Sequence, residues 1–460
     1  MPALAPEIFK AYDIRGVVGR TLTIDAVRLI GQAVGSLAAE HGRDAIVGGR
    51  DGRLSGPELL EALSSGILAS GVDVIDIGMV VTPMTYFAAE HLGTKCSVMV
   101  TGSHNPPDYN GLKMVVDGNA LSGDEIQALR TRIERGDLRH GAGTKRSEDI
   151  GDAYLDRITG DVRLARPMKI AVDCGNGVAG AFAPELYRRL GCEVVELFCD
   201  VDGRFPNHHP DPSQPANLED LERRLREGDC ELGLAFDGDG ARLGVVTPDG
   251  HVIYADRQLM LFAAALLARV PGATIIYDVK STRNMKPWIR EHGGVPLLWK
   301  TGHSLIKAKM KETGAALAGE MSGHTFFGER WYGFDDGLYA GARLLEIVSR
   351  DADPAAMLDA LPDALSTPEL QIACAEGEQH ALIAKLKEHA DFPGALEVIG
   401  IDGVRVEYPD GFGLARASNT TPVIVLRFEA DNEQALARIQ REFRRVLTAV
   451  KPGIALPFRG

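Results

Sequence analysis

The sequence predicts three α/β domains followed by a smaller C-terminal α+β domain, and three observations support this prediction. The chain has 460 residues, enough for three or four domains of ordinary size or two large ones. Short β-type runs alternate with helical apolar spacing over most of its length, which is typical of mostly parallel sheets. After Thr367 and Pro368 the alternation gives way to β-type runs between two helices.

The first α/β domain is predicted over residues 1–149. Its elements alternate as helix 26–42, strand 45–47, helix 56–70, strand 72–77, helix 83–92, strand 96–100 and helix 123–135. The last of these strands must end in a loop, because Pro106 and Pro107 follow it and proline cannot continue a strand. A polar, glycine-rich stretch at 136–148 is interpreted as a linker.

The same alternation restarts twice, which predicts domains at 150–251 and 252–363 and leaves 364–460 for the smaller domain. The second domain has strands 168–172, 193–198 and 232–236 with helices near 183–190 and 218–226. The third has helices 257–269, 284–292 and 304–313 with strands 274–279 and 295–299. The last has strand 369–373, helix 380–389, a hairpin at 396–408, strand 422–428 and helix 432–449.

Composition restricts the partners and the compartment. The 50 Lys and Arg residues are outnumbered by 64 Asp and Glu, for a net charge of −14, and no local basic stripe is present, so a nucleic-acid binder is not expected. Apolar runs are too short to cross a membrane and the first residues do not resemble a secretory signal, so we expect a cytoplasmic protein.

The six cysteines form no Cys-x-x-Cys pair and are interpreted as buried thiols.

Glycine is the unusual residue, with 52 copies, well above the ~7% of average proteins. Many of these glycines directly follow β-type runs, as at 48–52, 175–177 and 238–240. This placement predicts tight turns at strand ends, where ligand sites of parallel sheets lie.

Ser103 stands in the sequence Thr-Gly-Ser-His-Asn-Pro, just past the predicted strand 96–100. A serine at a strand end beside His104 can act as a nucleophile or carry a phosphoryl group. The alternative is an ordinary turn in which Ser103 and Asn105 satisfy backbone groups. A serine hydrolase is not expected, since the Gly-x-Ser-x-Gly turn is absent.

Asp237 and Asp239 follow the strand 232–236 in the sequence Asp-Gly-Asp-Gly. Two carboxylates at this spacing on a glycine-rich loop can converge on one hard cation, and magnesium is the natural occupant. An acidic surface turn is the alternative. A calcium loop is not expected, because Ala241 and Arg242 occupy the next positions, where that motif requires Asp or Asn and then Gly.

Three further polar loops are candidate binding sites. Residues 413–421 combine Arg416 with hydroxyl and amide side chains, which suits a phosphate group. Glu320 and Ser322 are spaced to hold two neighbouring hydroxyls of a sugar. Residues 300–303 form another strand-end cluster with a single histidine. Any of these loops taken alone is equally well an ordinary surface loop.

Together these segments resemble the α-D-phosphohexomutase superfamily and, within it, the bacterial phosphomannomutase/phosphoglucomutase enzymes. The resemblance covers essentially the whole chain, and its motifs appear in family order at 11–16, 101–113, 237–242, 319–323 and 416–421. It implies three related α/β domains and a smaller fourth domain around a central cleft. It also implies interconversion of the 1- and 6-phosphates of mannose or glucose through a phosphoserine and a hexose 1,6-bisphosphate, which also serves as activator.

The resemblance assigns roles to matching positions. Ser103 would be the phosphoserine and, with Asp237 and Asp239, would bind Mg²⁺. The other catalytic positions would be Arg15, His104, Lys113 and His303. The positions in contact with the phosphosugar would be Tyr12, Arg242, Lys280, Gly302, Glu320, Met321, Ser322, Gly323, His324, Arg416, Ser418, Asn419 and Thr420. Small phosphosugars are the expected partners, and the protein is expected to be a monomer.

One position departs from the family pattern. The family's metal loop ends in Asp-Arg, whereas this chain has Ala241 before Arg242, so the third carboxylate is missing and magnesium-dependent turnover is expected to be weakened. Either an ordinary mutase carries this substitution, or the chain is a catalytically silent phosphosugar-binding relative. A phosphoglucosamine mutase is the alternative enzyme, although the loop at 319–323 looks more like that of the mannose/glucose subgroup.

Overall fold

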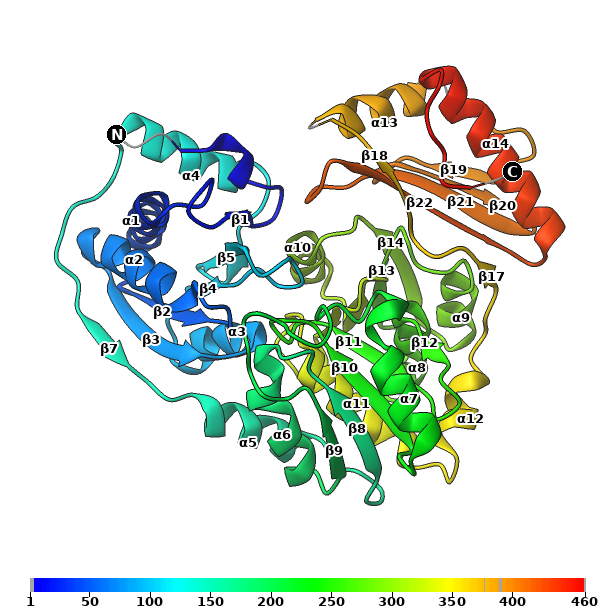
Figure 1. Cartoon of the computed structure of the whole chain (residues 1–460), viewed down its shortest axis with the longest axis horizontal. Helices are drawn as coiled ribbons and strands as arrows, with labels where there is room; N and C mark the ends of the chain where they lie inside the picture. Colours follow the sequence, from blue (N-terminus) through cyan, green and yellow to red (C-terminus); the bar gives the residue numbers. More distant parts are fainter. Residues whose placement is uncertain (1–3, 376, 389–390, 459–460) are drawn as a thin grey trace.

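The computed structural model describes residues 4–375, 377–388 and 391–458, and it contains four β-sheets. Figure 1 shows the N-terminal unit, in blue and cyan, and the C-terminal unit, in orange and red, as two lobes above a body formed by the green and yellow middle of the chain. The predicted class, three α/β units and a smaller C-terminal unit, is confirmed by this arrangement.

The first sheet has the strand order β1-β5-β4-β2-β3-β7, and β6 pairs with β5. Its strands are β1 (Ile14–Val17), β2 (Ala45–Arg50), β3 (Asp73–Met79), β4 (Ser97–Val100), β5 (Tyr109–Val116), β6 (Asn119–Ala120) and β7 (Lys145–Ser147). The helices are η1 (Pro6–Ile8), α1 (Ile24–Glu40), α2 (Gly56–Ala69), α3 (Thr82–His91) and α4 (Asp124–Arg135). Strands β2, β3 and β4 run parallel, whereas β5 is antiparallel to β1 and β4.

The second unit is a five-stranded sheet in the order β12-β11-β10-β8-β9. Its strands are β8 (Lys169–Asp173), β9 (Glu193–Leu197), β10 (Leu232–Phe236), β11 (Leu243–Val246) and β12 (Val252–Ile253). The helices are α5 (Gly151–Asp161), η2 (Val178–Ala181), α6 (Ala183–Arg189), η3 (Pro215–Asn217) and α7 (Glu219–Glu227). β8, β9 and β10 are parallel, so their carboxyl ends lie at one edge of the sheet.

The third unit is a four-stranded sheet in the order β14-β13-β15-β16. Its strands are β13 (Thr274–Asp278), β14 (Val295–Trp299), β15 (Leu317–Gly319) and β16 (Thr325–Phe327). The helices are α8 (Ala255–Leu267), α9 (Met285–Glu291), α10 (His303–Thr313), α11 (Gly337–Val348) and α12 (Pro354–Asp359). Loops that follow β13, β14 and β15 carry Lys280, Gly302 and Glu320, so the parallel strands again bring their polar ends together.

The C-terminal unit is an antiparallel sheet in the order β17-β22-β21-β20-β19, with β18 also paired to β22. Its strands are β17 (Leu365–Ser366), β18 (Leu370–Ala373), β19 (Glu397–Ile399), β20 (Val404–Tyr408), β21 (Gly411–Ala417) and β22 (Val423–Ala430). The helices are α13 (Glu378–Glu388) and α14 (Glu433–Val450), and residue 389 of the predicted helix lies outside the described residues.

Burial shows how the units are joined. One cluster of buried apolar side chains extends through the first three units and includes Met84, Leu186 and Phe262. The C-terminal unit has its own cluster, built around Phe428 and Phe443. The first three units therefore form one packed body, and the fourth is attached to it.

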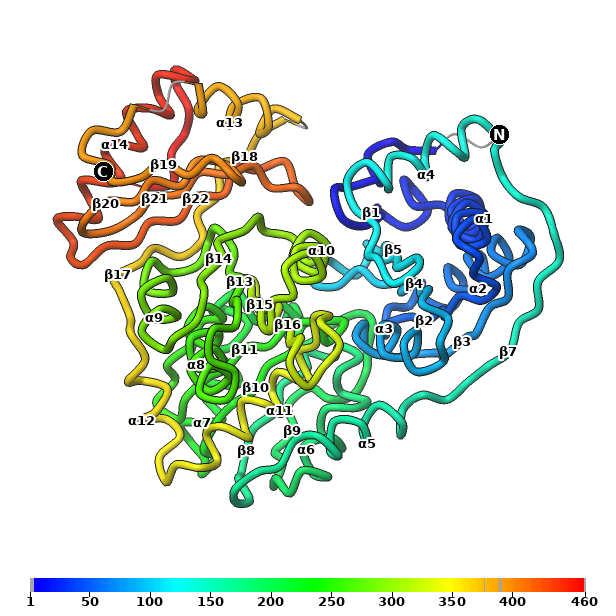
Figure 2. Tube along the Cα trace, turned by 180° about the vertical axis from the view of Figure 1, so that it is seen from behind, coloured from blue at the N-terminus to red at the C-terminus, as the bar shows by residue number. Residues whose placement is uncertain are grey.

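Several details differ from the sequence-based expectation. The linker expected at 136–148 contains β7, which pairs with β3 at the edge of the first sheet, and Figure 2 shows this segment running along the outside between α4 and α5. Strand β5 was not predicted because Asn110 and Lys113, both buried, interrupt its apolar pattern. Helix α11 was not predicted either. The described helices include none that is long and apolar enough to span a membrane.

Four of the cysteines are buried, in agreement with the expectation, but Cys199 and Cys374 are only partly buried. The sulfur of Cys199 lies 3.6 Å from that of Cys174. All six are free thiols.

Candidate active site in the central cleft

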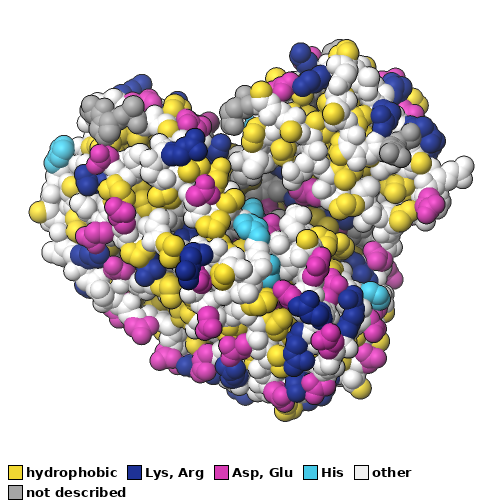
Figure 3. All heavy atoms as spheres, in the orientation of Figure 1, with side chains coloured by type: hydrophobic (Ala, Val, Ile, Leu, Met, Phe, Trp, Pro, Cys, Tyr) yellow, Lys and Arg dark blue, Asp and Glu magenta, His cyan; other side chains and the backbone are white. Residues whose placement is uncertain are grey.

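A cleft with a cavity of about 640 Å³ lies where the four units meet. Figure 3 shows the surface hollowed between the two upper lobes, with histidine side chains at its base. Side chains from all four units line the cavity, including Ser103, Arg242, Glu320 and Arg416. The structure thus brings the predicted catalytic and sugar-binding residues together from positions more than 300 residues apart.

Three of the predicted site residues do not line the cavity. Asp237 and Asp239 are completely buried directly behind Ser103. Asn419 is half-buried in the loop between Ser418 and Thr420, both of which face the cavity. The other predicted residues line the cavity: Tyr12, Arg15, Ser103, His104, Lys113, Arg242, Lys280, Gly302, His303, Glu320, Met321, Ser322, Gly323, His324, Arg416, Ser418 and Thr420.

Ser103 lies in a strained turn directly after β4. Its φ is +49°, a left-handed conformation that is uncommon for residues other than glycine. The Oγ atom lies 3.0 Å from Oδ2 of Asp237, 3.2 Å from Oδ1 of Asp239 and 3.4 Å from Nδ1 of His104. The turn therefore aims the hydroxyl at two carboxylates while the side chain still borders the cavity.

Arg53 holds this turn from behind and was not predicted from the sequence. Its guanidinium donates hydrogen bonds to the carbonyl oxygens of Ser103, Asn105, Pro106 and Tyr109. The side chain is completely buried. Its position after the strand-end glycines at 48–52 is the signal that could have indicated it.

Arg15, which packs against the same turn, donates hydrogen bonds to side-chain oxygens of Asn105 and Asp13. His104 lies beside Ser103, and its pKa is held well below the usual value because it is buried and close to Arg242 and Arg15. The uncharged ring thus stands next to two guanidinium groups. These groups give the cavity a positive wall beside the Ser103 hydroxyl.

The pKa values of the two carboxylates in the metal loop are shifted in opposite directions. Burial and the neighbouring charge of Asp239 raise the pKa of Asp237 to about 8. Burial alone would raise the pKa of Asp239 too, but Lys113, whose Nζ lies 2.7 Å from Oδ2, holds it well below the usual range. Two acids held this close in a buried site are stabilised by a cation.

The residues present fit magnesium. Mg²⁺ is commonly held by one or two carboxylates and keeps several waters, and Asp237, Asp239 and Ser103 present three oxygens to one point. The buried methyl group of Ala241 offers no ligand. Among the described residues, no three Asp, Glu, His or Cys side chains are grouped as a complete metal site.

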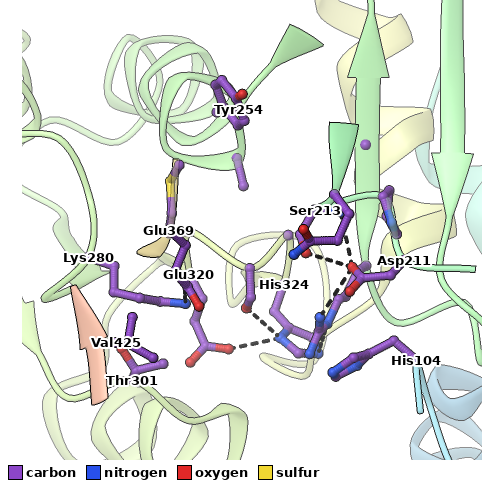
Figure 4. Close-up of a pocket in the computed structure, with 18 of the residues that line it drawn as sticks. His104, Asp211, Ser213, Tyr254, Lys280, Thr301, Glu320, His324, Glu369 and Val425 are labelled. Atoms are coloured by element: carbon purple, nitrogen blue, oxygen red, sulfur yellow. Dashed lines mark hydrogen bonds and ion pairs between the residues drawn. The ribbon is translucent and has the colours of Figure 1, made fainter. Parts of the chain in front are cut away.

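The loop after β15 forms a hydrogen-bonded unit at the opposite wall. Oε2 of Glu320 lies 2.9 Å from Nδ1 of His324, and the other oxygen accepts a hydrogen bond from the amide of Gly302. Ser322 Oγ is 3.3 Å from the same ring nitrogen of His324. Figure 4 shows Glu320 and His324 pointing toward each other at the floor of the pocket, with His104 to one side.

His303 begins helix α10, and its side chain contacts the N-terminal segment. Its ring makes an edge contact with the ring of Tyr12 at 5.5 Å between centroids. Burial and the charge of Lys307 hold its pKa well below the usual value. Within the described part of the chain, Nε2 of His303 is buried without a hydrogen-bond partner, so it is free to bond to a substrate.

The fourth unit supplies the loop after β21. Nε of Arg416 donates to Asp402 at 3.0 Å, whereas Nη2 is buried and has no partner among the described residues. Ser418 Oγ lies within hydrogen-bond distance of the hydroxyls of Thr420 and Thr421. A free guanidinium donor beside three hydroxyls suits a phosphate group.

Other residues of the site were not predicted. Glu369, at the start of the fourth unit, places its Oε2 2.9 Å from Nζ of the predicted Lys280. Lys307 pairs with Asp335 below His303. The loop after β9 reaches the first unit, where a ring nitrogen of His209 bonds to the carbonyl oxygen of His104. Contacts of this kind join distant segments, and neither spacing nor composition could indicate them.

The comparisons with known proteins follow the same division of the chain. Residues 6–140, 152–250 and 254–365 match phosphoglucomutase/phosphomannomutase alpha/beta/alpha domains I, II and III, and residues 369–446 match the C-terminal domain. The chain is 58% identical to a phosphoglucomutase of Neisseria meningitidis, with 99% of this chain and 100% of that protein aligned.

Two further relatives agree. A phosphomannomutase/phosphoglucomutase of Pseudomonas aeruginosa is 55% identical, with 99% of each chain aligned. A crystal structure of a phosphoglucomutase/phosphomannomutase family protein from Burkholderia thailandensis has a TM-score of 0.95 and 61% identity, covering 99% of this chain and all of that one. With the four domains and the cleft that they enclose, these matches show that the chain belongs to the phosphoglucomutase/phosphomannomutase family.

Proposed function

We propose that the protein interconverts the 1- and 6-phosphates of mannose and glucose, with Ser103 as the phosphoryl carrier and a hexose 1,6-bisphosphate as intermediate. The observation that carries this proposal is the position of Ser103 Oγ, 3.0 Å and 3.2 Å from two buried carboxylates. The same cavity contains the Glu320 loop and the Arg416 loop. A carrier, a sugar-binding loop and a phosphate-binding loop are the components that such a cycle needs.

Phosphoryl transfer depends mainly on positioning and on neutralising charge. Arg15 and Arg242 face the cavity beside Ser103 and can stabilise the transferring oxygens. Mg²⁺, held by Asp237, Asp239 and Ser103, would supply further positive charge there. Lys113 keeps Asp239 ionised through their 2.7 Å contact, which maintains this ligand at neutral pH.

His303 is proposed to take the proton of the attacking sugar hydroxyl, with Lys113 assisting from the other side. The unpartnered Nε2 of His303 supports this role. Glu320 and Ser322 are proposed to hold the sugar hydroxyls common to glucose and mannose. The Arg416 loop is proposed to hold the phosphate that is not reacting, and it can do so for either end of the sugar because its donors recognise phosphate alone.

Ala241 is proposed to weaken magnesium binding and hence turnover, since the family ligand at this position is a carboxylate. The test is a coupled assay with glucose 1-phosphate, glucose 1,6-bisphosphate as activator and a magnesium titration, run on this chain and on Ala241→Asp. We expect the variant to be saturated at roughly ten-fold lower Mg²⁺, the effect of about 1.4 kcal/mol, and to turn over faster. Equal magnesium curves would contradict this role of Ala241.

The same assay separates the alternative functions. A phosphoglucosamine mutase would use glucosamine 6-phosphate in preference to glucose 1-phosphate and mannose 1-phosphate. A silent binding protein would bind glucose 1-phosphate in calorimetry and give no product even at high magnesium. The protein is proposed to act as a monomer, and light scattering during gel filtration tests this.

A further inference from the structure

Lys307 lies one helical turn after His303 on the same face of α10, since residues four apart in a helix are neighbours. Its Nζ lies 2.9 Å from Oδ1 of Asp335 and 4.1 Å from the centre of the Tyr86 ring. Its side chain is 13% exposed and that of Asp335 is completely buried. A lysine side chain is thus held by a carboxylate and an aromatic face, one helical turn after His303.

The surroundings of His303 leave one ring nitrogen free for chemistry. Nδ1 lies 3.3 Å from the hydroxyl of Ser304, and Nε2 has no partner among the residues that the structure describes. The ring lies at the cavity wall. A ring in this position accepts a proton at Nε2 only while it is neutral.

We propose that Lys307 is a positioning residue for the reaction, which keeps the imidazole of His303 neutral and thereby preserves Nε2 as the proton acceptor. The inference rests on the proposed function of His303. In the step it serves, the sugar hydroxyl gives its proton to Nε2 while its oxygen bonds to phosphorus. The bond from phosphorus to Ser103 Oγ breaks, and the electron pair of that bond stays on Oγ. The imidazolium returns the proton in the opposite half of the cycle.

The other charges around His303 come from several elements and partly oppose one another. Lys307 and Lys113 disfavour a second positive charge on the ring, as does His324 when protonated, whereas Asp335 favours it. The rings of Tyr12, before β1, and His324, before β16, contact the ring of His303. The other charges that act on it are Lys113 on β5, Lys307 on α10 and Asp335 before α11. Lys307 is the largest of the charge effects, after burial itself.

The experiment follows the ring of His303 by NMR between about pH 5.5 and about pH 8.5, in wild type and Lys307→Met, with His303→Gln to assign the signal. In wild type we expect the ring to stay neutral over this window. In K307M we expect it to titrate within the window, because one neighbouring charge changes a pKa by roughly one unit or more. The acidic limb of kcat/KM should move upward by a similar amount.

Three variants complete the test. Lys307→Arg keeps the charge and should restore the wild-type titration. Lys307→Met with Asp335→Asn removes both charges, leaves no unpaired buried carboxylate, and should shift the titration less than K307M. Lys311→Met removes an exposed lysine of the same helix and should leave the His303 titration and the pH profile of kcat/KM unchanged.

The outcomes separate the two proposals. A His303 titration that is the same in wild type and K307M overturns the role of Lys307 and leaves the proposed function standing. A titration that moves while the kcat/KM profile stays fixed overturns the proton role of His303, on which the inference depends. Whether Ser103 carries the phosphoryl group, as the proposed function requires, is tested separately by labelling Ser103.

Discussion

At the scale of single residues, the cleft of this enzyme pairs nearly every cation with a carboxylate. Lys113 contacts Asp239, and Lys280 contacts Glu369. Arg416 is bonded to Asp402 through Nε, and its Nη2 is left without a partner in the described part of the chain. A buried donor in this state is stabilised when a phosphate accepts its hydrogen bond.

Arg416→Lys should therefore raise KM for glucose 1-phosphate with little change in kcat. Lysine keeps the charge but loses the fork of donors, and a charge-assisted hydrogen bond contributes about 1.5–3 kcal/mol. Steady-state kinetics should show KM raised roughly ten- to a hundred-fold. The exposed Arg441→Lys on α14 is the matched control. A variant that lost kcat at unchanged KM would place Arg416 in the chemical step instead.

The sequence alone predicted the functional residues that stand in a short motif. Ser103, Asp237 and Asp239 were predicted from strand ends and glycine spacing, and the structure places the three together. Arg53 and Lys307 were missed because their partners are far away in the chain. Asp335, for example, follows Lys307 by 28 positions, and no local pattern joins them.

At the scale of elements, the loop after β9 is the clearest addition to the sequence-based account. His208 Nε2 lies 3.0 Å from a carboxylate oxygen of Asp173 at the end of β8. The next residue, His209, bonds to the carbonyl of His104 in the first unit. Phe205 stacks under the guanidinium of Arg53 at 5.2 Å. The loop thus braces the turn that carries Ser103.

His208 should make the stability of the chain depend on pH. Burial lowers its pKa, but the hydrogen bond and charge of Asp173 outweigh burial, so the pKa is raised above the usual value. A histidine with a raised folded pKa contributes stability in full below the unfolded value of about 6.5, and loses it as the pH rises through the folded value. His208→Gln should therefore destabilise the protein more at about pH 5.5 than at about pH 9.

Urea midpoints at the two pH values measure this difference. The exposed His380→Gln is the control and should lower the midpoint at neither pH. If His208→Gln lowered the midpoint equally at both pH values, the ion pair with Asp173 would not be the source of the stability.

The elements themselves were predicted where their pattern was regular. Parallel strands such as β10 were found because all five of their residues are buried and apolar or small. Strand β5 was missed because it contains two buried polar side chains. Asn110 donates a hydrogen bond to Ser55 and Lys113 to Asp239, and these partners come close only in the folded chain. Tertiary contacts therefore decided the elements that the sequence pattern left undefined.

At the scale of the whole molecule, one apolar cluster runs through the first three units, and the fourth unit has a core of its own. The fourth unit is attached by a small apolar cluster of Val279, Phe412 and Leu414 and by several polar contacts. Arg405 in β20 donates to the carbonyl oxygens of Val279 and Ser281, each at 2.7 Å, and lies 3.8 Å from the centre of the Phe412 ring. Arg427 lies 3.3 Å from Asp256. A unit that has its own core and only a small apolar contact with the rest can move relative to it.

Arg405→Met should loosen the fourth unit without unfolding the body. It leaves two buried carbonyl acceptors without their donor, at a cost of about 2–4 kcal/mol. The three tryptophans, Trp288, Trp299 and Trp331, all lie in the third unit. In urea, circular dichroism of the variant should therefore begin to change before tryptophan fluorescence does.

Arg441→Met is the control for this experiment and should leave both signals as in wild type. If both signals of Arg405→Met moved together to lower urea, the fourth unit would unfold with the body and the contacts of Arg405 would not be its separate attachment.

The central claim is that Ser103 carries the phosphoryl group between the two ends of the sugar. It is tested most directly by mixing the protein with glucose 1,6-bisphosphate labelled with ³²P, quenching at intervals and mapping the label by mass spectrometry, with Ser103→Ala as control. The account predicts label on Ser103 that passes to glucose 1-phosphate at least as fast as the enzyme turns over, and none in the variant. Turnover with no label on Ser103, or label that stays there while product forms, would contradict it.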